Sequence, residues 1–172
     1  MNEMWIITVM KKLLILLFSI LISFNSNGET RYTYYDNGQI ESEGNNNDGK
    51  EHGKWTYWHK NGQKESERSL NDGKQDGTST YWNQDGQKNT ARNYKDGDLL
   101  TLYTYHKNGQ LETEENYKDG KKNGRVALWR FNGQLDTEGI YNAGIRVSQN
   151  SYYKNGQISL EINLKEDQLE GD

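Results

Sequence analysis

The side chains best suited to chemistry in this sequence are three histidines. His59 and His106 occupy the same place in two copies of a repeated motif, and His52 lies in a turn. If each copy supplies two strands of one sheet, His59 and His106 are four strands apart, roughly 19 Å. A histidine nitrogen binds a metal at about 2 Å, so these two side chains cannot share an ion. We therefore interpret all three histidines as exposed residues of loops or strands.

Acidic residues form the second candidate set, because they recur in pairs two positions apart. Two such carboxylates on one face of a strand lie about 7 Å apart, which suits the acid and base of an inverting glycosidase. A catalytic pair is normally unique, whereas this pair is copied in most repeats. We therefore interpret it as the solvated face of a sheet. The pairs are Glu41/Glu43, Glu65/Glu67, Glu112/Glu114 and Asp136/Glu138.

Other arrangements that carry chemistry are missing from the sequence. The chain has no cysteine, which excludes disulfides, thiolate metal sites and a lipoprotein cysteine. The Asp-Gly-Lys turns lack the acidic ladder and terminal Glu of an EF-hand, and the glycines are spaced as turns rather than as a phosphate-binding loop. No Ser-His-Asp arrangement is found. The sequence predicts a protein that is not an enzyme and holds no metal or cofactor.

The elements that position these side chains are set by a repeated triplet, Asn-Gly-Gln or Asp-Gly-Gln. Its glycines step by 24, 24, 23, 24 and 23 residues. Such a period is typical of arrays in which each unit is one small supersecondary element. We predict that these glycines are structural turns: Gly38, Gly62, Gly86, Gly109, Gly133 and Gly156.

Further positions recur when the Asn or Asp of each triplet is taken as position 0. Position −3 is aromatic in every copy, position +3 is Ile, Leu or Lys, and position +9 is Asn, Leu or Tyr. A second turn, Asp-Gly, follows and becomes Ala143-Gly144 in the fifth unit. A later glycine is present in three units and is replaced by Leu100 and Val147 in two others. The aromatics at −3 are Tyr34, Trp58, Trp82, Tyr105, Trp129 and Tyr152.

Asn-Gly and Asp-Gly between short strand-forming runs are the strongest local signal for β-hairpins, because these residues tolerate positive φ. Each unit is therefore predicted to be strand, turn, strand, turn. A two-residue loop would place position −3 on the same face as the acidic +4. A three-residue loop ending in a glycine bulge collects −3, +3 and +9 on one face and sends +4 and +6 to the other. We favour the three-residue loop, because it gives the better binary pattern.

The predicted fold is all-β, an elongated antiparallel meander of about twelve short strands. We interpret the aromatics at −3 as a packed stripe that runs from unit to unit. The opposite face also carries large side chains, and Tyr and Trp dominate the hot spots of protein interfaces. The candidate interaction surface consists of Trp55, Tyr57, Tyr81, Trp82 and Leu128.

Composition limits the partners. The net charge is −4, which gives no reason to expect nucleic acid and disfavours strong binding to an anionic membrane. Only 31% of the residues are hydrophobic, but twelve Tyr and five Trp at mostly fixed positions argue against disorder.

The two ends of the chain differ from the repeats. Lys11 and Lys12 precede an almost unbroken apolar run at 13–24, which is shorter than the about 20 residues of a membrane-spanning helix and is typical of an export signal. An uncleaved membrane anchor is the alternative, and translation starts at Met1 or Met10. We divide the chain into a signal peptide or hydrophobic segment (1–27), the repeat array (28–164) and a charged tail (165–172). The protein is expected in the periplasm, at the outer surface or secreted.

Two motifs indicate a family. Residues 71–78, Asn-Asp-Gly-Lys-Gln-Asp-Gly-Thr, and 117–124, Tyr-Lys-Asp-Gly-Lys-Lys-Asn-Gly, resemble the Tyr-x-Gly-Lys-x-x-Gly pattern of MORN repeats. The added Tyr-Trp-x-x-Asn-Gly-Gln segment at 57–63 resembles the bacterial MORN-variant repeat. Proteins with this variant are commonly described as YwqK-type antitoxins, so the resemblance implies binding and neutralisation of a toxin partner. Other MORN arrays act as scaffolds or recognise membranes, but this chain lacks a basic face.

These observations predict an exported, non-enzymatic repeat protein that binds another protein, either a toxin or a surface protein. The alternative is a module that binds carbohydrate or the cell wall through exposed aromatics. Repeats of that kind need an aromatic cage at each junction between units, and several units here offer one reliable aromatic.

Overall fold

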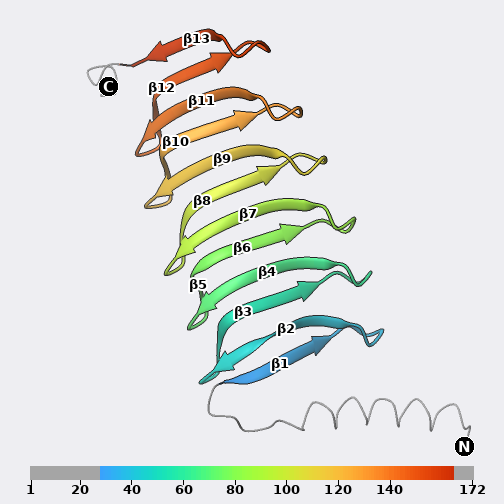
Figure 1. Cartoon of the computed structure of the whole chain (residues 1–172). Coiled ribbons are helices and arrows are strands. Elements are labelled where there is room, and N and C mark those ends of the chain that lie inside the picture. Colours follow the sequence, from blue (N-terminus) through green and yellow to red (C-terminus); the bar gives the residue numbers. More distant parts are fainter. Residues whose placement is uncertain (1–27, 165–172) are drawn as a thin grey trace, which may run out of the picture.

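The computed structural model describes residues 28–164, which form one open antiparallel sheet (Figure 1). Each strand pairs with the next one along the chain, and only the two-residue strand β5, which pairs with β4, lies off this path. The predicted all-β meander is confirmed. The strands are β1 (Glu29–Tyr34), β2 (Ile40–Asn47), β3 (Lys50–Trp58), β4 (Lys64–Asn71), β5 (Lys74–Gln75), β6 (Gly77–Trp82), β7 (Lys88–Lys95), β8 (Asp98–Tyr105), β9 (Leu111–Lys118), β10 (Lys121–Trp129), β11 (Leu135–Asn142), β12 (Ile145–Tyr152) and β13 (Ile158–Asn163).

The predicted signal helix within residues 1–27 and the predicted charged tail at 165–172 lie outside the described residues. Between residues 28 and 164 there is no helix with the length and apolar character needed to cross a bilayer.

The Asn-Gly-Gln turns lie in a row along one side of the sheet, at the ends of the strands (Figure 1). They close with the three-residue loop favoured from the sequence. The His59 backbone N–H donates to the Gln63 carbonyl, and the Gly62 N–H donates to the His59 carbonyl, both at 2.8 Å. Gly62 has φ of 83°, the left-handed region that favours glycine. The Asn61 side chain accepts a hydrogen bond from the Gln63 N–H at 3.0 Å. Asn therefore caps the turn, and Gly allows it to close.

The third residue of the triplet acts between units. A Cβ added at Gly86 would lie 2.6 Å from Oε1 of Gln63, and one added at Gly133 would lie 3.3 Å from the Gln110 side chain. Each of these glutamines thus covers the glycine of the next turn. A glutamine of one unit thus meets the turn glycine of the next at Gly62, Gly86 and Gly133, whereas a Cβ added at Gly109 or Gly156 would have no neighbour within 4 Å.

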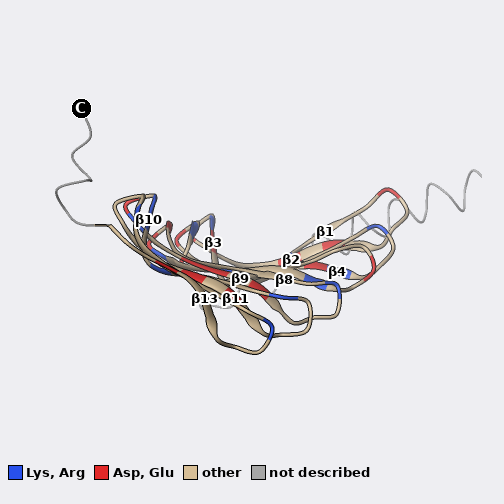
Figure 2. Cartoon of the chain, turned by 90° about the horizontal axis from the view of Figure 1, so that it is seen from above, with Lys and Arg blue, Asp and Glu red and all other residues tan. Residues whose placement is uncertain are grey.

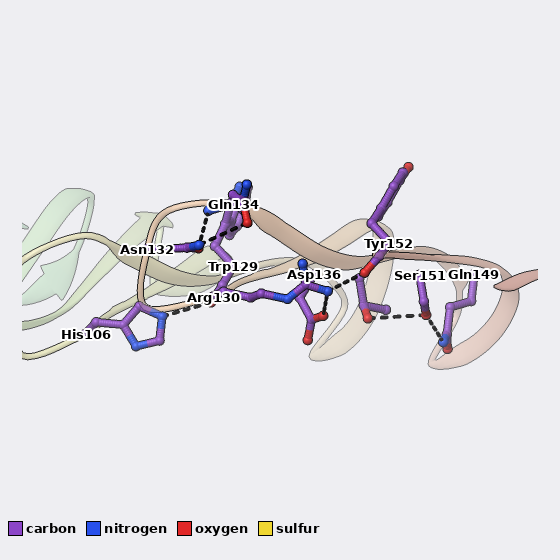
Figure 3. A network of polar contacts seen from close by, with 10 residues as sticks. His106, Trp129, Arg130, Asn132, Gln134, Asp136, Gln149, Ser151 and Tyr152 are labelled. Atoms are coloured by element: carbon purple, nitrogen blue, oxygen red, sulfur yellow. Dashed lines mark hydrogen bonds and ion pairs between the residues drawn. The ribbon is translucent and has the colours of Figure 1, made fainter. Parts of the chain in front are cut away.

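The residue at position −2 also links neighbouring turns. His106 Nε2 donates to the Trp129 carbonyl at 2.8 Å, and the Tyr35 hydroxyl donates to the Trp58 carbonyl at 2.6 Å (Figure 3 shows the His106 bond). Arg130 in the following unit donates to Asp136 and to the Tyr152 carbonyl. These side chains join consecutive units beyond the strand ladder itself.

The Asp-Gly turns lie in a row along the opposite side of the sheet, at the other ends of the strands, and each turn has two residues (Figure 1). Asn71 pairs with Lys74 across Asp72 and Gly73, whose φ values are 50° and 80°. Two successive positive φ values define a type I′ turn, which matches the twist of the flanking strands. Ala143 occupies the first turn position of unit five with φ of 49°, where most units place Asp.

A bulge after the Asp-Gly turn explains why some repeats have 24 residues and others have 23. In the 24-residue units, Gly53, Gly77 and Gly124 have positive φ, and the bulge holds two extra residues. In the 23-residue units, Leu100 and Val147 stand at this place and the bulge holds one. The length of each unit is therefore set by the size of its bulge.

A second bulge, at position +4, changes which residues share a face. Trp58 pairs with Lys64, whereas Tyr57 pairs with Ser66, so Glu65 has no partner across the ladder. Side chains alternate between faces along a strand, so one extra residue moves all later positions to the opposite face. The prediction that −3, +3 and +9 share one face is therefore wrong for +9, which lies opposite to −3.

The same bulge corrects the interpretation of the paired carboxylates. Glu41, at +4, accepts a hydrogen bond from Thr33 at 3.1 Å, while Glu43, at +6, accepts one from Tyr32 at 3.4 Å. Thr33 and Tyr32 are adjacent in β1 and point to opposite faces. The two carboxylates of this pair thus lie on opposite faces of the sheet, and the predicted shared face is wrong.

Within the described residues the sheet is a single bowed layer (Figure 2). Its few buried apolar side chains are Trp55, Leu70, Ala91, Val126 and Ala127. No aromatic at position −3 is buried: Tyr34 is 47% exposed and the other five are half-buried. The interpretation of these aromatics as a packed core is corrected, because no second layer covers them.

Candidate interaction surface

One face of the sheet is here called the hydroxyl face. It is defined by a row of directly paired residues, one from each strand except the two-residue β5. Ser and Thr occupy most of the row, and Tyr57, Tyr81 and Leu128 are its largest members apart from the end. Because directly paired residues point to the same side, every member lies on this face. The row is Thr33, Ser42, Tyr57, Ser66, Tyr81, Thr90, Thr104, Thr113, Leu128, Thr137, Ser151 and Leu160.

Two strand positions away, a second row on the hydroxyl face contains Gly44, Trp55, Arg68, Ser79 and Arg92. Trp55 pairs with Arg68, and Ser79 pairs with Arg92. This row continues through Leu102 and Glu115 to the far end of the sheet. The face therefore places tyrosines in one row beside arginines in the next.

Trp55 was predicted to be exposed, but the structure buries it. Its side chain is 5% exposed, its Nε1 donates to the Asn45 carbonyl at 3.0 Å, and its ring stacks on Tyr57 with centroids 6.1 Å apart. The ring lies over Gly44, where an added Cβ would be 2.1 Å from the ring carbon Cδ2. Trp55 packs against Tyr57 on the same face of β3 and, being buried, does not itself offer a surface.

Four side chains of this face, on strands β3, β4, β6 and β7 in the N-terminal half of the sheet, form a cluster here called the Tyr–Arg array. The Arg68 guanidinium lies over the Tyr57 ring at 4.3 Å and over the Tyr81 ring at 5.6 Å, and the Arg92 guanidinium lies over Tyr81 at 5.0 Å. All four side chains are half-buried. Each cation–π contact of this kind contributes about 0.5–1 kcal/mol at a partly exposed site.

The two guanidiniums of the Tyr–Arg array have no carboxylate within 4 Å among residues 28–164. The acidic residues of this face have other partners. Glu115 pairs with Lys122 at 2.7 Å, and Glu51 lies 3.5 Å from the Tyr57 hydroxyl. Burial, with the charge of Glu51, raises the pKa of Tyr57, so its hydroxyl stays protonated at neutral pH.

The remaining predicted residues lie elsewhere. Leu128 is in the hydroxyl row but on β10, and it is 41% exposed. Trp82 pairs with Lys88 on the opposite face, where the Lys64 ammonium lies 5.1 Å from its ring centroid. The structure therefore brings Tyr57 and Tyr81 together, buries Trp55 beneath them, and separates Trp82 and Leu128 from that group.

Arg68 and Arg92 are the members of the array that the sequence analysis missed. They stand at position +7 of units two and three, and Tyr stands at −4 in the same two units. In the other units, position +7 holds Gly, Glu or Ile, and position −4 holds Thr, Leu or Ser. The signal was a departure from the repeat confined to two neighbouring units, and a search for recurring residues overlooks it.

His59 and His106 contact the neighbouring turns and are half-buried, so their interpretation as exposed residues is wrong. His52 is exposed but lies in β3 and not in the predicted turn. His59 Nε2 donates to the Trp82 carbonyl at 3.0 Å, as His106 does to Trp129, and both Nδ1 atoms lie 3.8 Å from a glutamate of their own unit. Across residues 28–164 no group of three or more His, Asp or Glu side chains is placed to hold a metal ion.

Comparison with known proteins identifies the repeat. Three segments match the family model described as a MORN repeat variant: residues 30–45, 51–72 and 100–119. The predicted resemblance to MORN-variant repeats is thereby confirmed, while the narrower YwqK type stays a prediction. No curated protein matches the chain.

Among solved structures, the chain is similar to a crystal structure of a TarM mutant from S. aureus in complex with Fondaparinux, alpha-GlcNAc-glycerol and UDP. The identity is 13%, the TM-score is 0.35, and the match covers 89% of this chain. The chain spans about a quarter, 24%, of the length of that protein. A likeness at this level carries no argument about function.

Proposed function

This chain carries MORN-variant repeats, and on that premise we propose that it is a non-enzymatic scaffold that binds another protein through the hydroxyl face. The observation that supports this most is the Tyr–Arg array. Units two and three depart from the repeat at two positions, and the four resulting side chains meet at one place on an open sheet face.

The chemistry of the array suits a protein partner. Tyr and Arg are enriched among the residues that contribute most to protein interfaces. Arg68 lies over the rings of Tyr57 and Tyr81, Arg92 lies over the ring of Tyr81, and Tyr57 stacks on buried Trp55. Side chains that are already positioned lose little conformational entropy when a partner binds, so more of their contact energy contributes to affinity.

The test is capture of candidate partners by the full chain and by face-specific variants. Proteins encoded by neighbouring genes are expressed singly and passed over the immobilised chain. The double variant Tyr57→Ala, Tyr81→Ala is expected to weaken capture by tenfold or more, since the loss of two interface tyrosines costs about 2 kcal/mol or more. The matched control is Tyr105→Ala, which removes a half-buried tyrosine from the opposite face.

Capture that survives the double variant, or that is lost equally in Tyr105→Ala, would overturn the assignment to the hydroxyl face. Circular dichroism of each variant shows whether the sheet is intact.

The finer form of the proposal is an exported antitoxin-like or immunity-like protein that neutralises a toxin. It rests on the resemblance to YwqK-type antitoxins and on the apolar run at 13–24. Restored growth of cells that express a neighbouring toxin gene, with the chain co-expressed, supports this form. Growth arrest that persists while the two proteins bind each other contradicts it.

The alternative function, binding of carbohydrate or the cell wall, is supported by the half-exposed aromatics at position −3. Glycan-array binding that disappears in Trp82→Ala or Tyr57→Ala would favour this alternative over a protein partner.

A further inference from the structure

We infer that Arg68 and Arg92 recognise two carboxylates on an acidic segment of the partner protein. This inference rests on the proposed function and specifies the chemistry of the partner at the same site.

Most N–H donors of the two guanidiniums have no acceptor within residues 28–164. Arg68 Nε donates to Ser66 Oγ at 3.2 Å, and its guanidinium carbon lies 4.3 Å from the Tyr57 ring centroid and 5.6 Å from that of Tyr81. In residues 28–164 no further protein acceptor contacts Arg68, and none contacts Arg92. A guanidinium stacked on a ring keeps its N–H edge free, and this planar edge matches the two oxygens of a carboxylate.

The surroundings of the array favour an anion. The neighbours of the two arginines on the hydroxyl face are uncharged: Ser79 between them, and Trp55 and Leu102 on either side. Acidic side chains of this face have other neighbours: Glu115 pairs with Lys122 and Glu51 accepts from Tyr57, while Glu65, in the +4 bulge, lies 3.8 Å from His59 Nδ1. Two positive charges on β4 and β7 thus remain without a carboxylate partner on this face.

On the opposite face of β4, two lysines are already paired with a carboxylate. Glu67, on the adjacent position of β4, is held by Lys54 at 2.9 Å and by Lys64. Desolvation opposes its ionisation, but hydrogen bonds from these two lysines lower the pKa of Glu67. Lys88, also on the opposite face, has no carboxylate within 4 Å in residues 28–164, and its ammonium donates to the Tyr105 hydroxyl at 2.9 Å. Arg68 and Arg92 differ from it in standing in one row of the hydroxyl face with their guanidinium N–H groups largely without acceptors.

The spacing of the arginines specifies the segment. Arg68 and Arg92 lie two strands apart in one row, which corresponds to about 9.6 Å at ~4.8 Å per strand. An extended polyproline II segment rises about 3.1 Å per residue and repeats every three residues, so acidic side chains at i and i+3 lie about 9.3 Å apart on one side. An acidic segment of this kind, crossing the strands, presents one carboxylate to each arginine. Nucleic acid is a poorer match, because it needs many clustered cations rather than two.

The test measures fluorescence anisotropy of the full chain with a labelled peptide of sequence Pro-Glu-Pro-Pro-Glu-Pro-Pro. The control peptide carries Gln in place of both Glu. The acidic peptide is expected to bind, its affinity to fall as salt is raised, and the Gln peptide to show no binding. Arg68→Gln and Arg92→Gln are each expected to weaken binding about tenfold.

Two further variants distinguish the effect of the guanidinium's shape from the effect of its positive charge. Arg68→Lys keeps the charge but loses the planar fork, so it is expected to recover less than half of the lost affinity. Arg146→Gln removes an equal charge from an exposed side chain of β12, near the far end of the sheet, and is the matched control. Unchanged binding in this control supports the assignment to the array.

Several results would overturn the inference. They are a Kd for the acidic peptide above about 1 mM, equal binding by Arg68→Gln, and displacement of the peptide by inorganic phosphate at lower concentration than by glutamate. Self-association of the chain that disappears in the double variant Arg68→Gln, Arg92→Gln would instead assign the array to a second copy.

Failure of this inference is distinguishable from failure of the proposed function. If Tyr57→Ala, Tyr81→Ala abolishes capture of a protein partner but the two arginine variants do not, the scaffold function stands and the acidic segment is rejected. If neither set of variants affects capture, both are rejected.

Discussion

The contact between Gly44 and Trp55 allows a prediction that tests how the hydroxyl face is built. Gly44 has no positive φ, so its conformation alone permits any residue. A Cβ at this place would nevertheless lie 2.1 Å from Cδ2 and 2.3 Å from Cε2 of the Trp55 ring, far inside contact distance. Gly44→Ala must therefore displace a tryptophan that is 5% exposed.

The magnitude follows from what the ring loses. Removal of a buried Trp side chain costs about 3–5 kcal/mol, and a displaced ring keeps part of its contacts. We expect Gly44→Ala to lower the free energy of unfolding by about 2–4 kcal/mol, with the loss concentrated in the first units because contacts in the array are local. In a chain that already carries Trp55→Ala, the clash is gone, and we expect Gly44→Ala to cost less than about 0.5 kcal/mol.

Urea denaturation of the four chains, followed by circular dichroism, gives the coupling energy. Gly49→Ala is the control: Gly49 has φ of 81° and no neighbour within 4 Å, so its cost of about 1 kcal/mol comes from backbone strain and does not depend on Trp55. Equal costs of Gly44→Ala with and without Trp55 would refute the packing described here.

Three further changes test the turns and the ion pairs. Ala143→Asn is expected to raise the free energy of unfolding by about 0.5–1 kcal/mol, because Asn tolerates the φ of 49° better than Ala; a lower value in urea denaturation would contradict the turn assignment. His106→Ala removes the bond to the Trp129 carbonyl and is expected to cost about 1 kcal/mol by the same measurement, whereas exposed His52→Ala should change it by less than about 0.5 kcal/mol. Hydrogen bonds from the Tyr152 hydroxyl and from Arg125 lower the pKa of Glu138, so its contribution is complete above its unfolded pKa of 4.5 and is lost as pH falls through the folded pKa. Glu138→Gln should therefore flatten the fall in stability below that pH, and an identical pH profile for both chains would contradict the pair.

The sequence was sufficient for the elements whose causes are local. Asn and Gly at 61 and 62 specify a three-residue loop through their own backbone preferences, and the period of the triplet specifies an array of hairpins. The difference between 24- and 23-residue steps also corresponds to the two sizes of bulge, at Gly53 and Leu100 for example. Only the pairing of the strands shows that a bulge is the cause.

The faces of the sheet were predicted less well, because they depend on register. The bulge at Glu65 has no marker in the local sequence, yet it reverses the side on which Ser66 and every later residue of β4 lies. One unrecognised residue was enough to misplace position +9 and to pair carboxylates that are on opposite faces.

The sequence by itself determined the repeat, the turns, the all-β class and the placement of Tyr57 and Tyr81 on the face opposite position −3, because each follows from residue preferences within a unit. Only the tertiary structure decided that Trp55 is buried over Gly44 and that Arg68 and Arg92 stand beside those tyrosines without a carboxylate partner. Those contacts join side chains from neighbouring strands, so they depend on cross-strand register, which is a property of the assembled sheet and of no single unit.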